Sequence, residues 1–135
     1  MNKLGVWIDH KKAVMVFLNE DRYRIEHVKS DAENHYRPSG GWKSSGTNVA
    51  QSIVKEKTAE ERRKHQYHEF YKKIIDKCGN VGRMYIFGPS EAKIEFKKEL
   101  GKIKNSPITI DEVAPSDKLT DHEVLQKVKS FYHVM

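Results

Sequence analysis

The sequence contains a single cysteine, Cys78, among its 135 residues. One thiol makes no disulfide within the chain, and no second thiol exists to complete a CxxC metal or redox motif. Structural zinc held by thiolates is therefore excluded. Long apolar runs are also missing, and those present are too short to span a bilayer. The N-terminal residues turn acidic at Asp9, where the apolar region of a secretory signal would lengthen. We therefore predict a cytoplasmic protein with no membrane contact.

The length and the net charge of the chain indicate how many domains it forms and what class of partner it can bind. A chain of 135 residues has the size of one compact domain, so residues 1–135 are predicted to form a single domain. Hydrophobic residues at 37% and charged residues at 33% allow a modest core. Twenty-five lysines and arginines stand against nineteen acidic residues, which leaves a net charge of +6 and a pI near 9.3. This positive balance permits contact with a polyanion.

Strand-like patterns fill the first part of the chain, at residues 3–9, 13–19 and 22–28. The short polar connections between them suit hairpins, so an antiparallel meander is predicted. The first two segments are apolar on both faces and should be central, whereas the third alternates charged and apolar residues and should lie near an edge. Residues 30–57 then have many turn formers and few apolar side chains, which predicts a long flexible loop.

A helical period begins at Thr58, because apolar residues recur at intervals of three and four up to Cys78. Thr58 and Glu61 have the spacing of a capping box, and Gly79 supplies a stop, so a helix of roughly twenty residues is predicted. A strand at residues 82–88 follows.

The last part of the chain repeats this alternation of helix and strand. Ser90 is the predicted cap of a second helix, residues 107–113 form a strand, and Thr120 with Glu123 opens a third helix. The element order β-β-β-α-β-α-β-α predicts an α/β protein with a mixed five-stranded sheet between layers of helices. This is the order of the ribonuclease-H-like three-layer fold.

Asp9 is the first candidate for chemistry, because it ends the first predicted strand. Ribonuclease-H-type nucleases place a metal-binding carboxylate there, and two divalent ions need several converging oxygen ligands. No second acidic residue has a diagnostic spacing, so Asp9 is better interpreted as the start of a turn with His10. No serine lies in a Gly-x-Ser-x-Gly elbow, and Cys78 falls on an apolar helix face, so no catalytic nucleophile is predicted.

The first predicted helix has a strongly basic stretch, Arg62, Arg63 and Lys64. His65 and His68 have a spacing that can bind a transition metal, but the neighbouring positive charges disfavour a cation. We therefore predict no metal or cofactor here, and a solvated basic face that could contact phosphates.

Several short motifs resemble one protein family. They are Gly-Val-Trp-Ile-Asp-His at residues 5–10, a Gly-Gly loop before a long charged helix, Tyr-Ile-Phe-Gly-Pro-Ser-Glu-Ala-Lys at residues 85–93, and Asp-Lys-Leu-Thr-Asp at residues 117–121. Together they resemble the middle domain of class-1 peptide release factors and their Pelota-like relatives, and small bacterial release-factor-like proteins of the translational machinery look especially similar. The resemblance implies the same fold and a role in translation.

In the release factors, a Gly-Gly-Gln loop enters the ribosomal peptidyl-transferase centre and promotes hydrolysis of the peptidyl-tRNA ester. Gly40 and Gly41 match the two glycines by position, and Trp42 stands where the family has glutamine. The closer analogy is with Pelota-type relatives, which also lack the glutamine and act in rescue of stalled ribosomes. The codon-recognition and partner-binding domains of release factors have no counterpart here, so partner proteins would have to supply them.

These observations predict a non-enzymatic protein associated with ribosomal RNA or tRNA. The predicted contact residues are Arg37, Gly40, Gly41, Trp42 and Lys43 of the loop and Arg62, Arg63 and Lys64 of the helix. Three alternatives stay open: a peptidyl-tRNA hydrolase acting through the Gly-Gly loop, a metal-dependent nuclease acting at Asp9, and a protein-interaction module that uses a sheet edge or the aromatic helix. The oligomeric state is left open.

Overall fold

The computed structural model of the chain describes residues 2–30 and 49–134, with the backbone alone for residues 49–57. In these residues the chain forms strands and helices in the order β1 (Asn2–Ile8), β2 (Lys12–Asn19), β3 (Arg22–Lys29), α1 (Val49–Lys77), β4 (Val81–Gly88), α2 (Ala92–Gly101), β5 (Thr109–Pro115) and α3 (Asp121–Phe131). The predicted order of elements is confirmed.

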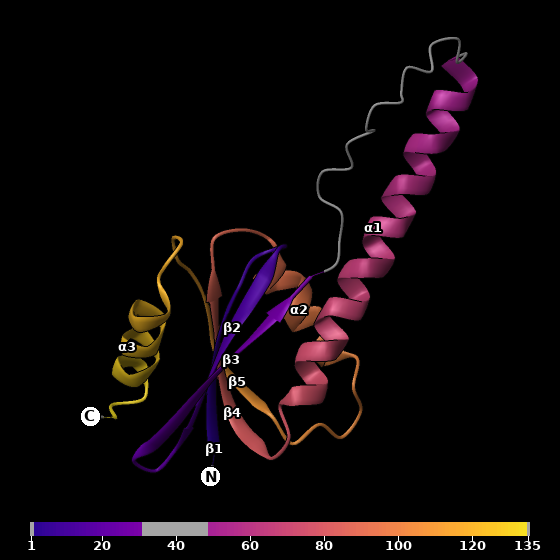
Figure 1. The fold of residues 1–135 in the computed structure, drawn as a ribbon. Coiled ribbons are helices and arrows are strands. Elements are labelled where there is room, and N and C mark those ends of the chain that lie inside the picture. Colours follow the sequence, from indigo (N-terminus) through magenta and orange to yellow (C-terminus); the bar gives the residue numbers. More distant parts are fainter. Residues whose placement is uncertain (1, 31–48, 135) are drawn as a thin grey trace.

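The strands form one mixed five-stranded sheet in the order β3-β2-β1-β4-β5 (Figure 1). β1, β2 and β3 pair antiparallel as the predicted meander, and β4 and β5 join parallel. Val6 at the centre of β1 lies opposite Met15 on β2 and Ile86 on β4. β3 forms one edge, as its alternating pattern predicts. The predicted ribonuclease-H-like α/β layout is confirmed.

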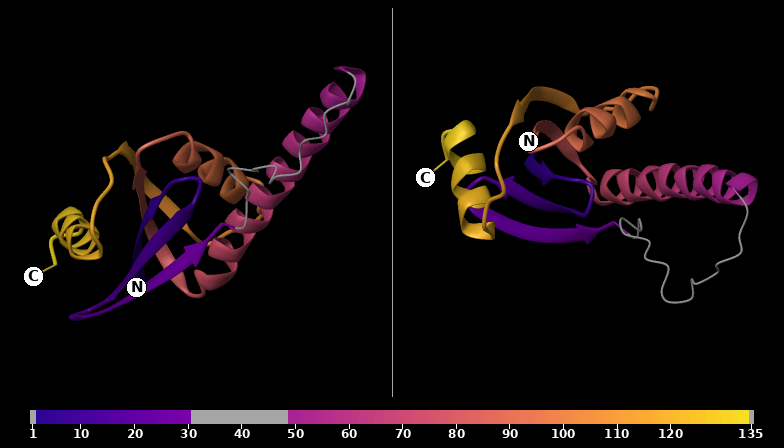
Figure 2. Two further views of the ribbon diagram at one scale, coloured as in Figure 1. Left: turned by 45° about the horizontal axis from the view of Figure 1, so that its top comes forward. Right: turned by 90° about the horizontal axis from the view of Figure 1, so that it is seen from above.

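Helices cover both faces of the sheet, with α1 and α2 on one face and α3 on the other (Figures 1 and 2). On the first face, Ile8 of β1 packs in one cluster with Phe70 of α1 and Phe96 of α2. On the second face, the fully buried Trp7 packs in a cluster with Val128 of α3. The indole Nε1–H of Trp7 also donates to the carbonyl of Asp117 at 3.0 Å, so this buried polar group is satisfied.

The start of α1 corrects the sequence prediction, because the helix begins at Val49 and not at Thr58. Residues 49–57 contain no proline or glycine and include several good helix formers, so the backbone continues in the helix and Thr58 lies inside it. The predicted loop at 30–57 is therefore too long at its C-terminal end. The rest of that loop, residues 31–48, lies outside the described residues.

Local signals at the other helix ends succeed at one position and fail at another. Thr120 and Glu123 form the predicted capping box, in which the Glu123 N–H donates to Thr120 Oγ1 at 3.2 Å and the Thr120 N–H to Glu123 Oε1 at 2.8 Å. Ser90 does not cap α2. The N-cap is Glu91, whose helical φ of −75° lets its carbonyl accept the first helical N–H groups without a side-chain hydrogen bond. The last strand begins two residues later than predicted, after Pro107.

The C-terminal end of α3 is tied to the sheet through Asp111 of β5. Arg83 of β4 donates to both carboxylate oxygens of Asp111, with Nη2 2.6 Å from Oδ1 and Nε 3.0 Å from Oδ2. The hydroxyl of Tyr132 donates to Oδ2 at 2.9 Å. The hydrogen bonds from Arg83, which outweigh the effect of burial, lower the pKa of Asp111.

Replacement of Arg83 by glutamine is expected to lower stability at neutral pH and to have little effect in acid. A carboxyl group whose pKa is lowered in the folded state contributes stability above its unfolded pKa of about 3.9, and this contribution is lost as the pH falls through the folded pKa. Urea unfolding from pH 7 to pH 2 should therefore show the gap between wild type and Arg83→Gln closing below about pH 4. A gap that stays constant with pH would contradict this role of Asp111.

Candidate nucleic-acid interface

The N-terminal half of α1 stands away from the sheet. The helix has 29 residues and so a length of about 44 Å, and among its described side chains, those of residues 58–77, the first buried one is Phe70. The free half projects past the other elements (Figure 2). It bears the predicted basic stretch, in which Arg62 and Lys64 are exposed and Arg63 is half-buried.

A groove of about 440 Å³ lies between α1 and α2. From α1 it is lined by Lys64, Tyr67, His68 and Tyr71. From α2 it is lined by Glu95, Lys98 and Glu99, and Lys102, the residue that caps the C-terminus of α2, completes the lining. We call this the α1–α2 groove. It brings one member of the predicted basic stretch, Lys64, together with two lysines that are distant in the sequence, Lys98 of α2 and Lys102 at its C-cap.

Glu99 in the groove is engaged by two neighbouring groups. The Nδ1 atom of His68 lies 3.0 Å from Glu99 Oε1, and the ammonium of Lys102 donates to the same oxygen at 3.4 Å. Burial alone would raise the pKa of Glu99, but these partners outweigh it and lower the pKa. The negative charge of Glu99 is therefore largely compensated within the groove.

Glu95, the other groove carboxylate, belongs to a hydrogen-bonded cluster at the end of β1. Tyr71 donates its hydroxyl hydrogen to Glu95 Oε1 at 2.6 Å, and His10 Nε2 lies 3.0 Å from the same oxygen. Burial and the bonded carboxylate raise the pKa of Tyr71, so it stays a neutral donor. The ring of His10 also packs on Tyr67 at a centroid distance of 4.7 Å.

The remaining groove lysines have no such partners. Across residues 2–30 and 58–134, neither Lys64 nor Lys98 takes part in an ion pair. Because both carboxylates are engaged by other groups, these two ammonium groups are available to an anion. The sequence prediction missed Lys98 and Lys102, since a lysine off the apolar stripe of an ordinary helix has no distinguishing local signal.

The residues considered as metal ligands form hydrogen bonds and ion pairs with other protein groups. The carboxylate of Asp9 accepts the backbone N–H groups of Lys11 and Lys12, each at 2.8 Å, which confirms its interpretation as a turn residue. His65 pairs with Glu69 at 3.8 Å, and His68 is bonded to Glu99. The part of the chain that the structure describes contains no group of three or more potential ligands.

Cys78 directly follows the last residue of α1 and is buried in the cluster under that helix, as its position in the apolar pattern predicts. The side chain is 3% exposed, and its thiol donates to the carbonyl of Ile74 at 3.3 Å. Burial raises the pKa of the thiol to about 12, so it stays protonated at neutral pH. It is a packing residue.

The predicted loop contacts, Arg37, Gly40, Gly41, Trp42 and Lys43, lie outside the described residues. Val49, the first described residue after them, lies at the far end of the projecting half of α1 (Figure 1).

Comparisons with known proteins add a likeness at the level of structure. No family model matches the sequence, and no curated protein matches it. The chain is similar to the crystal structure of an archaeal translation termination factor, aRF1, with a TM-score of 0.41 and 13% identity over 98% of this chain and 39% of that one. A second structure, described as an archaeal protein, has a TM-score of 0.38 and 13% identity over 98% and 38%. The chain spans about two fifths of the length of these structures. Likeness at this level assigns no activity.

No helix within the described ranges has both the length and the hydrophobicity needed to cross a membrane.

Proposed function

We propose that this protein binds structured RNA through the α1–α2 groove and the adjoining basic face of α1, and that it does so as a cytoplasmic, translation-related protein without ester hydrolysis. One observation supports the proposal above the others. Lys64 of α1 and Lys98 of α2 approach one groove without ion-pair partners among the described residues, while both groove carboxylates are engaged by neighbouring groups, Lys102 among them.

The chemistry of the groove suits a phosphate backbone. Lysine ammonium groups displace counterions condensed on nucleic acid, which supplies affinity without reading sequence. Arg62 and Arg63 extend this positive surface along the projecting half of α1. Tyr67 adds an aromatic ring at the groove, on which a base can stack.

The sequence resemblance to release-factor and Pelota middle domains supports ribosomal RNA or tRNA as the target. In this proposal Arg37, Gly40, Gly41, Trp42 and Lys43 add contacts beyond the groove. Trp42 lacks the side-chain amide of the family glutamine, so hydrolysis is not part of the proposal.

Removal of two groove charges should weaken RNA binding in a salt-dependent way. The double variant Lys64→Gln/Lys98→Gln should reduce association with ribosomes. The negative slope of log affinity against log salt should become less steep by about 2, one for each lost phosphate contact. Ribosome pelleting at several salt concentrations measures both quantities.

A matched control removes the same charge from the opposite side of the sheet. Lys127 lies on α3 and Lys118 shortly before it, and both are exposed. Because α3 lies on the other side of the sheet from α1 and α2 (Figure 1), Lys118→Gln/Lys127→Gln should leave the salt slope nearly unchanged. Equal losses in both double variants would show that net charge alone drives association. Absence of wild-type protein from ribosomal fractions at every salt concentration, with no affinity for structured RNA, would remove the proposal.

A further inference from the structure

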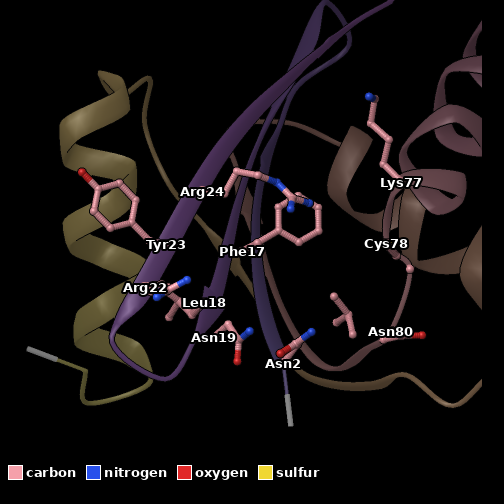
Figure 3. Close-up of a pocket in the computed structure, with 12 residues that line it drawn as sticks. Asn2, Phe17, Leu18, Asn19, Arg22, Tyr23, Arg24, Lys77, Cys78 and Asn80 are labelled. Carbon is pink, nitrogen blue, oxygen red and sulfur yellow. The ribbon is translucent and has the colours of Figure 1, made fainter.

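A second cavity, of about 410 Å³, lies where α1 ends beside the β2–β3 hairpin (Figure 3). Here α1 has reached its last residue, Lys77, and no longer covers the sheet. Phe17 of β2 is half-buried and faces the same side as Arg24 of β3, its partner across the strands. The cavity thus exposes a portion of the sheet face that no helix packs on.

Arg24 and Phe17 form a cation–π pair in this cavity. The guanidinium of Arg24 lies over the Phe17 ring at 4.4 Å from its centroid, as Figure 3 shows. The Arg24 side chain is 62% exposed, so much of it remains accessible to a ligand. Planar guanidinium groups supported in this way are stacking partners for nucleobases.

Positive charge surrounds this pair. Arg22, Arg24 and Lys77 all line the cavity. Glu26 bonds Arg24 at 2.7 Å and Lys77 at 3.2 Å, and these partners, which outweigh burial, lower the pKa of Glu26. One carboxylate is thus shared by two cations, which leaves an excess of two positive charges. The acidic residues of the hairpin turn, Glu20 and Asp21, do not line the cavity.

Three side-chain amides complete the lining, from Asn2, Asn19 and Asn80. Within residues 2–30 and 58–134, none of these amides forms a hydrogen bond with another protein group. Each amide offers both donors and an acceptor, which is the combination that recognises the edge of a base, above all adenine.

We propose that this cavity binds one nucleotide, with the base stacked on Arg24, its edge facing the asparagine amides, and its phosphate attracted by the positive charges of Arg22 and Lys77 on either side of Arg24 (Figure 3). The volume lies within the range of small-molecule sites. An acidic peptide would use the cations but would leave the stacking surface and the amides without a role, so the combination favours a nucleotide. The site is separate from the α1–α2 groove and does not depend on it.

The test uses the full chain and adenosine monophosphate, followed by backbone amide chemical shifts in NMR titration. We expect saturable shifts at Asn19, Arg24 and Asn80. Arg24→Gln should weaken binding by roughly tenfold or more, the loss expected for one stacked base. Arg24→Lys keeps the charge but removes the planar group, so it should weaken binding to a similar extent. Lys118→Gln, an exposed change near α3, is the control and should bind as wild type does.

Three further probes decide the source and class of the ligand. A short single-stranded oligoadenylate and the mononucleotide should both bind if free nucleotide is the ligand, whereas binding of the oligonucleotide alone would point to single-stranded RNA. Inorganic phosphate should bind much more weakly than either. Tighter binding of an oligoglutamate peptide, full affinity in Arg24→Lys, or no binding of either nucleotide probe would overturn the proposal. The variant Lys64→Gln/Lys98→Gln should keep its nucleotide affinity, so failure of the groove proposal would be seen separately.

Discussion

Replacement of Gly88 by alanine is expected to destabilise the protein by about 3 kcal/mol or more, because overpacking and backbone strain act at the same residue. An added Cβ would overlap the backbone carbonyl oxygen of Ile8 and would lie 3.1 Å from its carbonyl carbon. Gly88 also has a φ of +157°, which side chains rarely adopt. Ile8 ends β1, which is paired on both sides with β2 and β4, so its backbone has little freedom to move away.

Urea unfolding with Gly101→Ala as the matched control tests this expectation. Gly101 ends α2, and a Cβ there meets no atom within 4 Å, so the control should stabilise the protein by about 0.4 to 1 kcal/mol. Gly88→Ala should instead lower the urea midpoint strongly or prevent folding. If the two variants unfolded at similar urea concentrations, the close approach of β4 to the end of β1 would be contradicted.

The second large effect is expected at Gly5, where α3 meets the sheet. A Cβ on Gly5 would overlap the Val128 side chain, whose Cγ1 would be 2.7 Å away. Val128 is fully buried on α3, so the helix would have to shift, and Gly5→Ala should cost roughly 1 to 3 kcal/mol. Val128→Ala alone should also destabilise, by roughly 1 to 3 kcal/mol, because it leaves a cavity.

The double variant Gly5→Ala/Val128→Ala shows whether the two residues are in direct contact or lower the stability independently. The smaller side chain at residue 128 makes room for the new methyl group, so the double variant should be more stable than the sum of the single effects by roughly 1 kcal/mol. Val128→Ala combined with Gly101→Ala, which do not share a contact, should be additive. Additive behaviour of the Gly5 pair would show that α3 does not rest on Gly5.

The two proposed sites differ in how far the sequence reveals them. Arg62, Arg63 and Lys64 are adjacent, so the basic face of α1 is visible from the sequence. The groove is not, because Lys98 and Lys102 join Lys64 only when α2 packs beside α1. The cavity at the hairpin is equally hidden, since Phe17 and Arg24 belong to different strands and meet through the register of β2 with β3.

Local interactions explain which elements were predictable. The alternation of apolar residues, the turn at Asp9 and the capping box of Thr120 and Glu123 all depend on residues a few positions apart, and the sequence by itself determined them. The same local signals failed at Thr58 and Ser90, where a cap-like spacing did not prevent the helix from starting elsewhere. Only the tertiary structure decided where α1 stops packing, which lysines share a groove and which arginine covers Phe17. These three features depend on contacts between segments that are distant in the sequence. Such contacts are stabilised by the burial of side chains, which no single segment of the chain achieves alone.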